Sequence, residues 1–184
     1  VQSERLKPLR SIRLDNGKAN GWGKRMDYES RRHPHRLPDS EYERLWQPVY
    51  FSAATQDRRP ILTRPHCPAI LLEALREAEQ QYGTSAIAFC VMPDHVHLLA
   101  CVSIGGGNVR DCFEHFEALS GYRISRLGFE VPIWQRSYFD RHVRQKTPIW
   151  RVVNYILDNP VEEGLCARRE DWRWAAYFGL PWEQ

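Results

Sequence analysis

The sequence predicts an α+β fold, an antiparallel sheet with helices on one face in the ferredoxin-like split βαβ arrangement. The order of patterned segments is strand, helix, strand, strand, helix, strand, helix, which contains a βαββαβ core. Only two residues separate the two middle strands, and so short a link favours an antiparallel hairpin. The chain has 184 residues with 42% hydrophobic content, enough for one compact domain with a core.

The first strand and the first helix are predicted at residues 46–55 and 69–81. The segment WQPVYFSAAT is rich in aromatic and β-branched residues, which favour strands. Residues 56–68 contain three prolines and are predicted as a loop. In residues 69–81 apolar side chains recur at helical spacing, and Gly83 follows as a stop signal. The apolar face of this helix consists of Leu71, Leu72, Leu75 and Ala78.

The predicted hairpin follows. Its strands are the apolar runs 85–92 and 95–102, which flank a Pro-Asp link, and three glycines at 105–107 end the second strand. Residues 109–127 can form a long helix, and residues 132–143 are predicted to be extended.

The last helix is predicted to begin at a Thr-Pro pair. Thr147 is expected to be its N-cap, with Pro148 at the first helical position. The helix should continue through Val152 and Ile156. We expect it to end before Pro160, because proline lacks the N–H that would continue the hydrogen-bond ladder.

Basic residues are concentrated at the start of the chain. The formal net charge is only +3, but residues 1–36 carry ten basic side chains against four acidic ones. We therefore expect residues 1–40 to form a basic N-terminal extension in which Arg31 and Arg32 meet phosphates. The alternative is a solvated tail without a partner.

Cysteine usage and hydropathy indicate the compartment. The five cysteines form no CxxC pair, so we expect reduced thiols, no zinc ribbon and a cytoplasmic protein. No apolar run approaches the roughly 18 residues of a membrane helix. The basic N-terminus is not followed by an apolar segment, so we expect neither a secretory signal nor a membrane anchor.

Two histidines interrupt the apolar strand at 95–102. Because side chains alternate along a strand, His95 and His97 point to the same face about 6.8 Å apart along the chain, while Val96 and Leu98 face the core. Two imidazoles can close that span onto one cation. Spacing alone leaves a core role for these histidines open.

A metal site needs a third ligand, and the last helix offers one. Tyr155 and Asn159 are four residues apart and so share a helix face, with Cβ atoms about 6 Å from each other. Tyr155 could then direct its phenol at a phosphate while Asn159 adds an amide oxygen to the same metal. On local sequence alone, a packed aromatic residue and a helix-ending asparagine are the favoured interpretation.

Four motifs in order resemble those of the IS200-like tyrosine transposases, and most closely the REP-associated branch, whose members accompany repetitive extragenic palindromes in bacteria. The similarity covers about residues 46–178. Four ordered motifs are more specific than any one of them. They are DHVH (94–97), WQRSYFDRHVR (134–144), NYILDNPVEEGL (154–165) and EDWRWAAY (170–177).

The resemblance implies an HUH endonuclease-like catalytic domain at 41–184. His95 and His97 would be the HUH metal ligands, Asn159 the third ligand and Tyr155 the nucleophile. Tyr138 is an unsuitable nucleophile, because its segment is extended and lacks a ligand-type residue one helical turn later. The implied activity is metal-dependent cleavage and transfer of single-stranded DNA through a 5′-phosphotyrosine. The cation, Mg²⁺ or Mn²⁺, is implied by the resemblance, since imidazole ligands alone would favour zinc, nickel or copper.

The implied partner is single-stranded or hairpin DNA of REP-like palindromes, in a nucleoid-associated protein. Candidate DNA contacts are Arg136, Arg141 and Arg144, with Trp134, Tyr138 and Trp150 as candidates for base stacking. We expect a monomer, with a dimer as the alternative.

One feature departs from the family pattern. Glu117 stands in the long helix where relatives often carry a basic residue, and Glu114 adds a second negative charge, which could weaken or redirect DNA binding. Two other functions stay open. One is a domesticated hairpin-binding protein with little catalytic activity, and the other is an unrelated metal hydrolase.

Overall fold

The computed structural model describes residues 38–103, 105–144 and 146–183. The predicted phosphate contacts of Arg31 and Arg32, and most of the predicted extension 1–40, therefore lie outside the described residues. The strands are β1 (Val49–Ala54), β2 (Thr84–Val91), β3 (His95–Val102), β4 (Phe139–His142) and β5 (Ala175–Tyr177). The α-helices are α1 (Asp39–Tyr42), α2 (Cys67–Tyr82), α3 (Val109–Ser125) and α4 (Ile149–Glu162). Short 3-10 turns lie at Gln56–Arg58, Arg169–Asp171 and Pro181–Glu183.

The predicted α+β class and antiparallel sheet are confirmed. Five strands pair in the order β4-β1-β3-β2-β5, and every neighbouring pair is antiparallel. The first four strands follow the split βαβ order, because β3 inserts between β1 and β2. The predicted hairpin is the β2–β3 pair. Gly83 ends α2 as predicted, at a φ of 57° that suits glycine.

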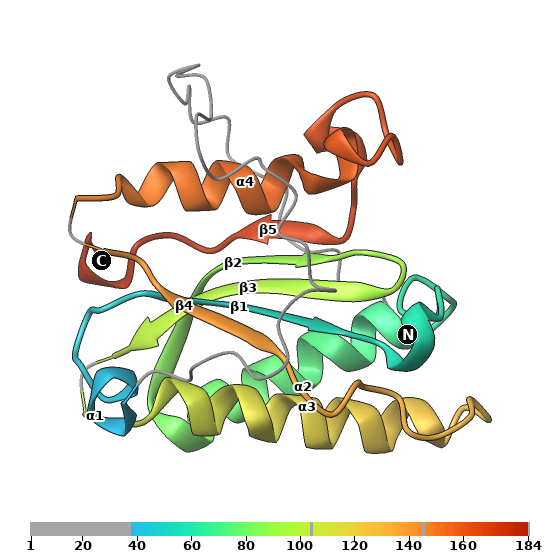
Figure 1. Ribbon diagram of the computed structural model, residues 1–184, viewed down its shortest axis with the longest axis horizontal. Helices are drawn as coiled ribbons and strands as arrows, with labels where there is room; N and C mark the ends of the chain where they lie inside the picture. Colours follow the sequence, from blue (N-terminus) through green and yellow to red (C-terminus); the bar gives the residue numbers. More distant parts are fainter. Residues whose placement is uncertain (1–37, 104, 145, 184) are drawn as a thin grey trace.

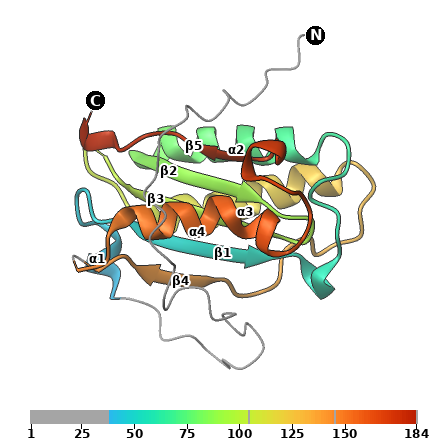
Figure 2. The same cartoon turned by 90° about the horizontal axis from the view of Figure 1, so that it is seen from above.

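Helices cover both faces of the sheet, whereas the sequence predicted them on one face. The two helices of the βαββαβ core, α2 and α3, do lie together on one face, and α4 lies across the other (Figures 1 and 2). The sheet therefore separates two apolar clusters. The physical reason is that strands β1 and β3 have buried side chains on both faces, so the second face also needs a cover.

Alternation along β3 directs the histidines toward α4. Val96 and Leu98 pack in the cluster beneath α2 and α3, as predicted. Leu99 packs in the cluster beneath α4, and His95 and His97 share its side of the strand. The predicted alternation is therefore confirmed, although both faces of β3 are buried.

Helix α4 differs from its prediction at both ends. Pro148, not Thr147, is the N-cap residue, and no side chain caps this end. Pro160 lies inside the helix, which continues to Glu162. A proline removes only one ladder hydrogen bond, and here Pro160 is buried while Glu163 N–H still donates to the Asn159 carbonyl at 2.9 Å. Packing and the remaining bonds keep the last turn helical.

The sequence overestimated one strand and missed another. Of the predicted extended segment 132–143, only Phe139–His142 forms a strand, β4. Strand β5 was not predicted, because three residues among tryptophans give no readable period. It extends the sheet beyond β2, and the Trp172 indole donates to the Val91 carbonyl at 3.0 Å to anchor the segment.

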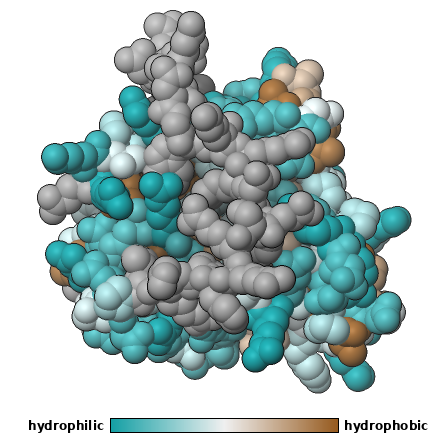
Figure 3. Space-filling view, viewed as in Figure 1, coloured by the Kyte–Doolittle hydropathy of each residue, from teal (hydrophilic) through white to brown (hydrophobic). Residues whose placement is uncertain are grey.

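On the face seen in Figure 3, the described residues are mainly hydrophilic, and the hydrophobic ones form small, separate patches. Among the described residues no helix is both long and apolar enough to cross a membrane.

Candidate active site

The two histidines converge from the start of β3. His95 and His97 are 6% and 3% exposed, and their Nε2 atoms lie 3.0 Å apart. Their rings are perpendicular, with centroids separated by 4.7 Å. The two Nε2 atoms therefore face a single point.

A different partner holds the other nitrogen of each ring. His95 Nδ1 lies 2.7 Å from Asp94 Oδ1, and His97 Nδ1 lies 2.6 Å from the Tyr50 hydroxyl. Contacts of this kind fix ring orientation and tautomer at metal sites. Both rings are thus held with Nε2 directed at the other ring.

The electrostatics of this pair follow from burial. Burial, and next the neighbouring His95, lower the pKa of His97 well below 6.5, so its ring is neutral at pH 7. Burial opposes ionisation of Asp94, but the hydrogen bond and charge of His95, together with Arg58, hold its pKa below the usual value. A neutral imidazole beside an ionised carboxylate suits cation binding.

Tyr155 and Asn159 approach the histidines from α4. They share the helix stripe with the buried Val152 and Ile156, so packing that stripe on the sheet brings both polar side chains to the site. The Tyr155 ring centroid is 5.8 Å from that of His97. Tyr155 is partly exposed.

Asn159 is oriented by its own helix. Its Nδ2 donates to the Tyr155 carbonyl at 2.5 Å, which leaves Oδ1 to act as an acceptor or ligand. Asn159 is 6% exposed and also hydrogen-bonds the His97 ring. Its amide oxygen is therefore available beside the histidine pair.

The phenol of Tyr155 is neutral at pH 7. Burial raises its pKa above 10, while hydrogen bonds from Tyr50 and Asn159 act in the opposite direction. A neutral phenol is a weak nucleophile. Any displacement by Tyr155 needs an activated electrophile.

The geometry fits an octahedral cation. Two ligands at right angles, each about 2.1 Å from a cation, are separated by about 3.0 Å, and the two Nε2 atoms are 3.0 Å apart. Within the described part of the chain, no three His, Cys, Asp or Glu side chains are grouped to hold a metal. The third protein ligand would have to be of another type, which the Asn159 amide supplies.

The predicted DNA-contacting arginines lie at different places on the surface. Arg141 pairs opposite Tyr50 in the β1–β4 ladder and so shares the face of the histidines. Arg136 is exposed in the segment before β4, and Arg144 is exposed just after it. Only Arg141 is on the sheet face of the candidate site.

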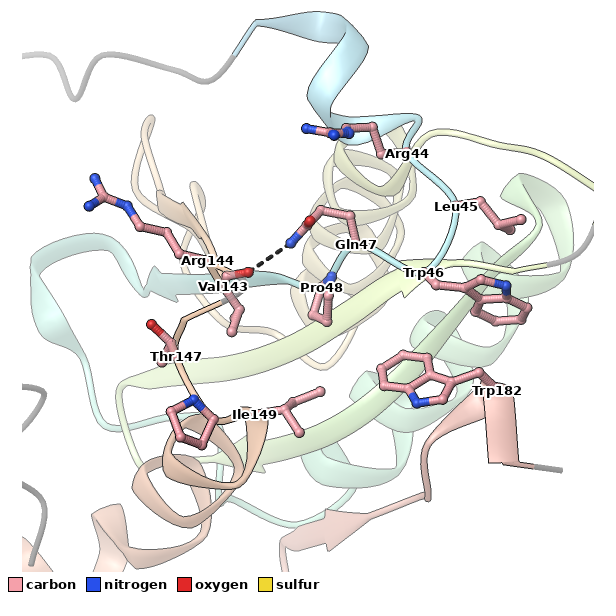
Figure 4. Close-up of a pocket in the computed structure, with 11 residues that line it drawn as sticks. Arg44, Leu45, Trp46, Gln47, Pro48, Val143, Arg144, Thr147, Ile149 and Trp182 are labelled. Carbon is pink, nitrogen blue, oxygen red and sulfur yellow. Dashed lines mark hydrogen bonds between the residues drawn. The ribbon is translucent and has the colours of Figure 1, made fainter.

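Arg144 borders a groove of about 520 Å³ at the start of α4 (Figure 4). Arg44 lies on the same rim, and the indoles of Trp46 and Trp182 meet edge to face with centroids 6.0 Å apart. The Gln47 amide donates to the Val143 carbonyl at 2.7 Å. The groove thus combines guanidinium groups with partly exposed indoles.

Two of the predicted stacking residues are buried, which corrects that prediction. Trp134 is 8% exposed and donates to the Ser120 hydroxyl at 3.1 Å. Tyr138 is 5% exposed and donates to Glu114 at 2.8 Å. Both pack in the cluster beneath α2 and α3, because the apolar face of α3 needs aromatic partners. Trp150 is partly buried against Tyr177, with ring centroids 5.2 Å apart.

The acidic side chains of α3 lie away from the histidines. Glu114 and Glu117 belong to α3, on the opposite side of the sheet from α4 (Figure 1). Their charge therefore does not face the candidate site.

Sequence reasoning missed three contributors, namely Tyr50, Asp94 and Arg58. Asp94 could have been found, because it directly precedes His95. Arg58 Nε lies 3.5 Å from Asp94 Oδ2, which places its charge at the rim of the site. Tyr50 is 47 positions from His97, and only the β1–β3 register brings them together.

Comparisons with known proteins agree with the predicted resemblance. The model of the IS200-like transposases matches residues 52–159, more than half of the chain. A Haemophilus influenzae protein described as a REP-associated tyrosine transposase is 23% identical over 147 residues, which is 70% of this chain and 78% of that protein. A solved REP-associated tyrosine transposase bound to a REP hairpin aligns with a TM-score of 0.64 and 19% identity, covering 78% of this chain and 81% of that one. This structural likeness supports the fold, and the match of the family model shows that the chain belongs to the IS200-like transposase family.

Proposed function

We propose that this protein is a metal-dependent endonuclease and strand transferase of single-stranded DNA that acts at hairpins through a 5′-phosphotyrosine intermediate. The observation that carries the proposal is the meeting of four side chains from two distant segments. They are His95 and His97 of β3, and Tyr155 and Asn159 of α4. A pair of imidazoles, an amide and a phenol beside one another match the implied chemistry of the family.

The ligands are His95 Nε2, His97 Nε2 and Asn159 Oδ1. When bound there, Mg²⁺ or Mn²⁺ would polarise a non-bridging oxygen of the scissile phosphate and offset its negative charge. Asp94 and Tyr50 hold the two imidazole rings in place through Nδ1.

Tyr155 is the proposed nucleophile. A tyrosine with an ordinary pKa near 10 is only about 0.1% phenolate at pH 7, and burial raises the pKa of Tyr155 further. Its Oη would form a bond to phosphorus while the bond from phosphorus to the 3′ oxygen breaks. The phenol proton is lost and the departing 3′ oxygen gains one, leaving a 3′-hydroxyl and a 5′-phosphotyrosine. The covalent link retains the phosphodiester energy, so another 3′-hydroxyl can reverse the step and join a new strand.

Hairpin DNA is the proposed partner. The solved relative holds a REP hairpin. In this chain, Arg58 lies at the rim of the histidine site and Arg141 is on the same sheet face, while the Arg144 groove offers indoles as well as positive charge. Arginine with an aromatic surface suits unpaired nucleotides. Arg136 and the extension 1–40, with Arg31 and Arg32, would add phosphate contacts.

A covalent adduct tests the proposal. Labelled single-stranded hairpin DNA is incubated with the protein and Mn²⁺ and run on a denaturing gel. Wild type should give an adduct that Tyr155→Phe lowers to background without losing hairpin affinity. Tyr177→Phe, a partly buried tyrosine on β5, should still form the adduct.

Two results would count against this assignment. Undiminished adduct in Tyr155→Phe would exclude Tyr155 as the nucleophile. Tight hairpin binding without any adduct, across the palindromes of the source genome, would instead indicate a domesticated binding protein.

A further inference from the structure

Tyr50 links the histidine pair to the proposed nucleophile. It is fully buried near the start of β1, on the sheet face covered by α4. Its ring stacks on His97, with centroids 5.9 Å apart and planes 24° apart, and meets Tyr155 edge on, with centroids 6.0 Å apart. Its hydroxyl is 2.6 Å from His97 Nδ1 and also hydrogen-bonds the Tyr155 phenol.

His97 can hold a cation only through the lone pair of Nε2, so the hydrogen of the neutral ring is then on Nδ1. His97 Nδ1–H donates to the Tyr50 oxygen, and the single hydrogen of Tyr50 is left for the Tyr155 oxygen.

The surroundings leave few other outcomes for that hydrogen. Tyr50 is 0% exposed, so bulk water is not a ready acceptor. Ser52, two residues along the same strand face, donates its hydroxyl hydrogen to the Tyr50 oxygen. Tyr155 is therefore the acceptor for the Tyr50 hydroxyl hydrogen.

We propose that Tyr50 is a positioning residue that links the metal ligand to the nucleophile, because it accepts from His97 Nδ1–H and directs its own hydroxyl hydrogen to the Tyr155 oxygen. This inference rests on the proposed function of the site. A donor aimed at the Tyr155 oxygen stabilises the negative charge that develops when the phenol loses its proton.

Tyr50→Phe tests whether the contact between Tyr50 and His97 supports metal binding. The substitution removes one hydroxyl and keeps the ring. Because outer contacts of metal-bound histidines typically contribute 10- to 100-fold to affinity, Mn²⁺ binding measured by calorimetry should weaken by roughly that factor. Tyr138→Phe is the matched control, since it removes a buried hydroxyl from the opposite side of the sheet and should leave Mn²⁺ affinity unchanged. Unchanged affinity in Tyr50→Phe would overturn the proposal.

The cleavage rate at saturating Mn²⁺ tests the contact between Tyr50 and Tyr155. Tyr50→Phe should cleave about 10-fold more slowly than wild type, because loss of one donor to the reacting oxygen persists when the metal site is full. If Mn²⁺ affinity were weakened but the cleavage rate at saturating Mn²⁺ were that of wild type, Tyr50 would affect only the metal site. The proposed link between His97 and Tyr155 would then be wrong.

The ring nitrogens of wild-type His97 provide a readout that needs no variant and no cleavage. In ¹⁵N-histidine NMR spectra recorded with Mg²⁺, His97 should carry its hydrogen on Nδ1, which donates to Tyr50. A hydrogen on His97 Nε2 under these conditions would overturn the proposal. If wild type forms no DNA adduct, the proposed function fails, yet the spectra and the Mn²⁺ affinities still decide the role of Tyr50.

Discussion

The two histidines are supported in unequal ways. His95 Nδ1 is hydrogen-bonded to the carboxylate of the preceding residue, Asp94, which is a local and charge-assisted contact. His97 Nδ1 is hydrogen-bonded to the neutral phenol of Tyr50 in another strand, and the His97 ring also contacts Tyr155. His97 is therefore the ligand through which changes in β1 and α4 reach the metal site.

Substitution of His97 should abolish metal-dependent cleavage. His97→Ala removes one of three proposed ligands, so Mn²⁺ affinity should fall by more than the roughly 10- to 100-fold typical of an outer contact. Adduct formation should drop to background while metal-free hairpin binding persists. His115→Ala, on α3 across the sheet, is the control. Cleavage at the wild-type rate in His97→Ala would exclude this metal site.

Among the secondary-structure elements, α4 both covers the sheet and carries residues of the proposed site. Its apolar stripe closes the second face of the sheet, and the same stripe carries Tyr155 and Asn159. Its first turn, six residues before Tyr155, borders the groove with Arg144. At 1.5 Å per residue, the groove begins about 9 Å along the helix from the nucleophile, which an unpaired strand could span within a few nucleotides.

The groove should contribute to binding through charge. Arg144→Ala should weaken the affinity for single-stranded DNA and reduce the slope of log K against log salt by roughly 0.7, the value for one lost phosphate contact. Binding is measured by fluorescence anisotropy over a salt series. Arg126→Ala, an exposed arginine after α3, should leave the slope unchanged. An unaltered slope in Arg144→Ala would remove the groove from the DNA interface.

At the scale of the whole molecule, one chain supplies every proposed site residue. His95, His97, Tyr155 and Asn159 meet within a single chain, so no helix from a second copy is needed to complete the site. A monomer, as expected from the sequence, would therefore contain the whole proposed site. Strand β5 also covers the edge of β2, which would otherwise be open to pairing.

Mixing two inactive variants tests this arrangement. His97→Ala retains the tyrosine and Tyr155→Phe retains the ligands, so a mixture can rebuild an intact site only if helices are exchanged between chains. We expect no adduct from the mixture and a light-scattering mass near 21.7 kDa for wild type. Recovery of up to a quarter of the wild-type sites, as random pairing would give, would indicate a dimer with exchanged helices.

Local patterns were enough for much of the fold and for the residues proposed at the site. The two-residue period placed His95 and His97 on one side of β3, and four-residue spacing placed Tyr155 and Asn159 on one face of α4. Both relations depend on backbone geometry within a few residues. The same kind of reasoning failed at Pro160, where the burial of α4 outweighs the missing hydrogen bond.

Only the tertiary structure decided which faces meet. The sequence did not place α4 opposite α2 and α3, did not detect β5, and could not show that Trp134 and Tyr138 are buried. Nor could it pair Tyr50 with His97, since that contact depends on the register of two strands distant in the sequence. Periodicity records which side chains share a face, whereas the partner of each face is set by competition among non-local contacts for the same core.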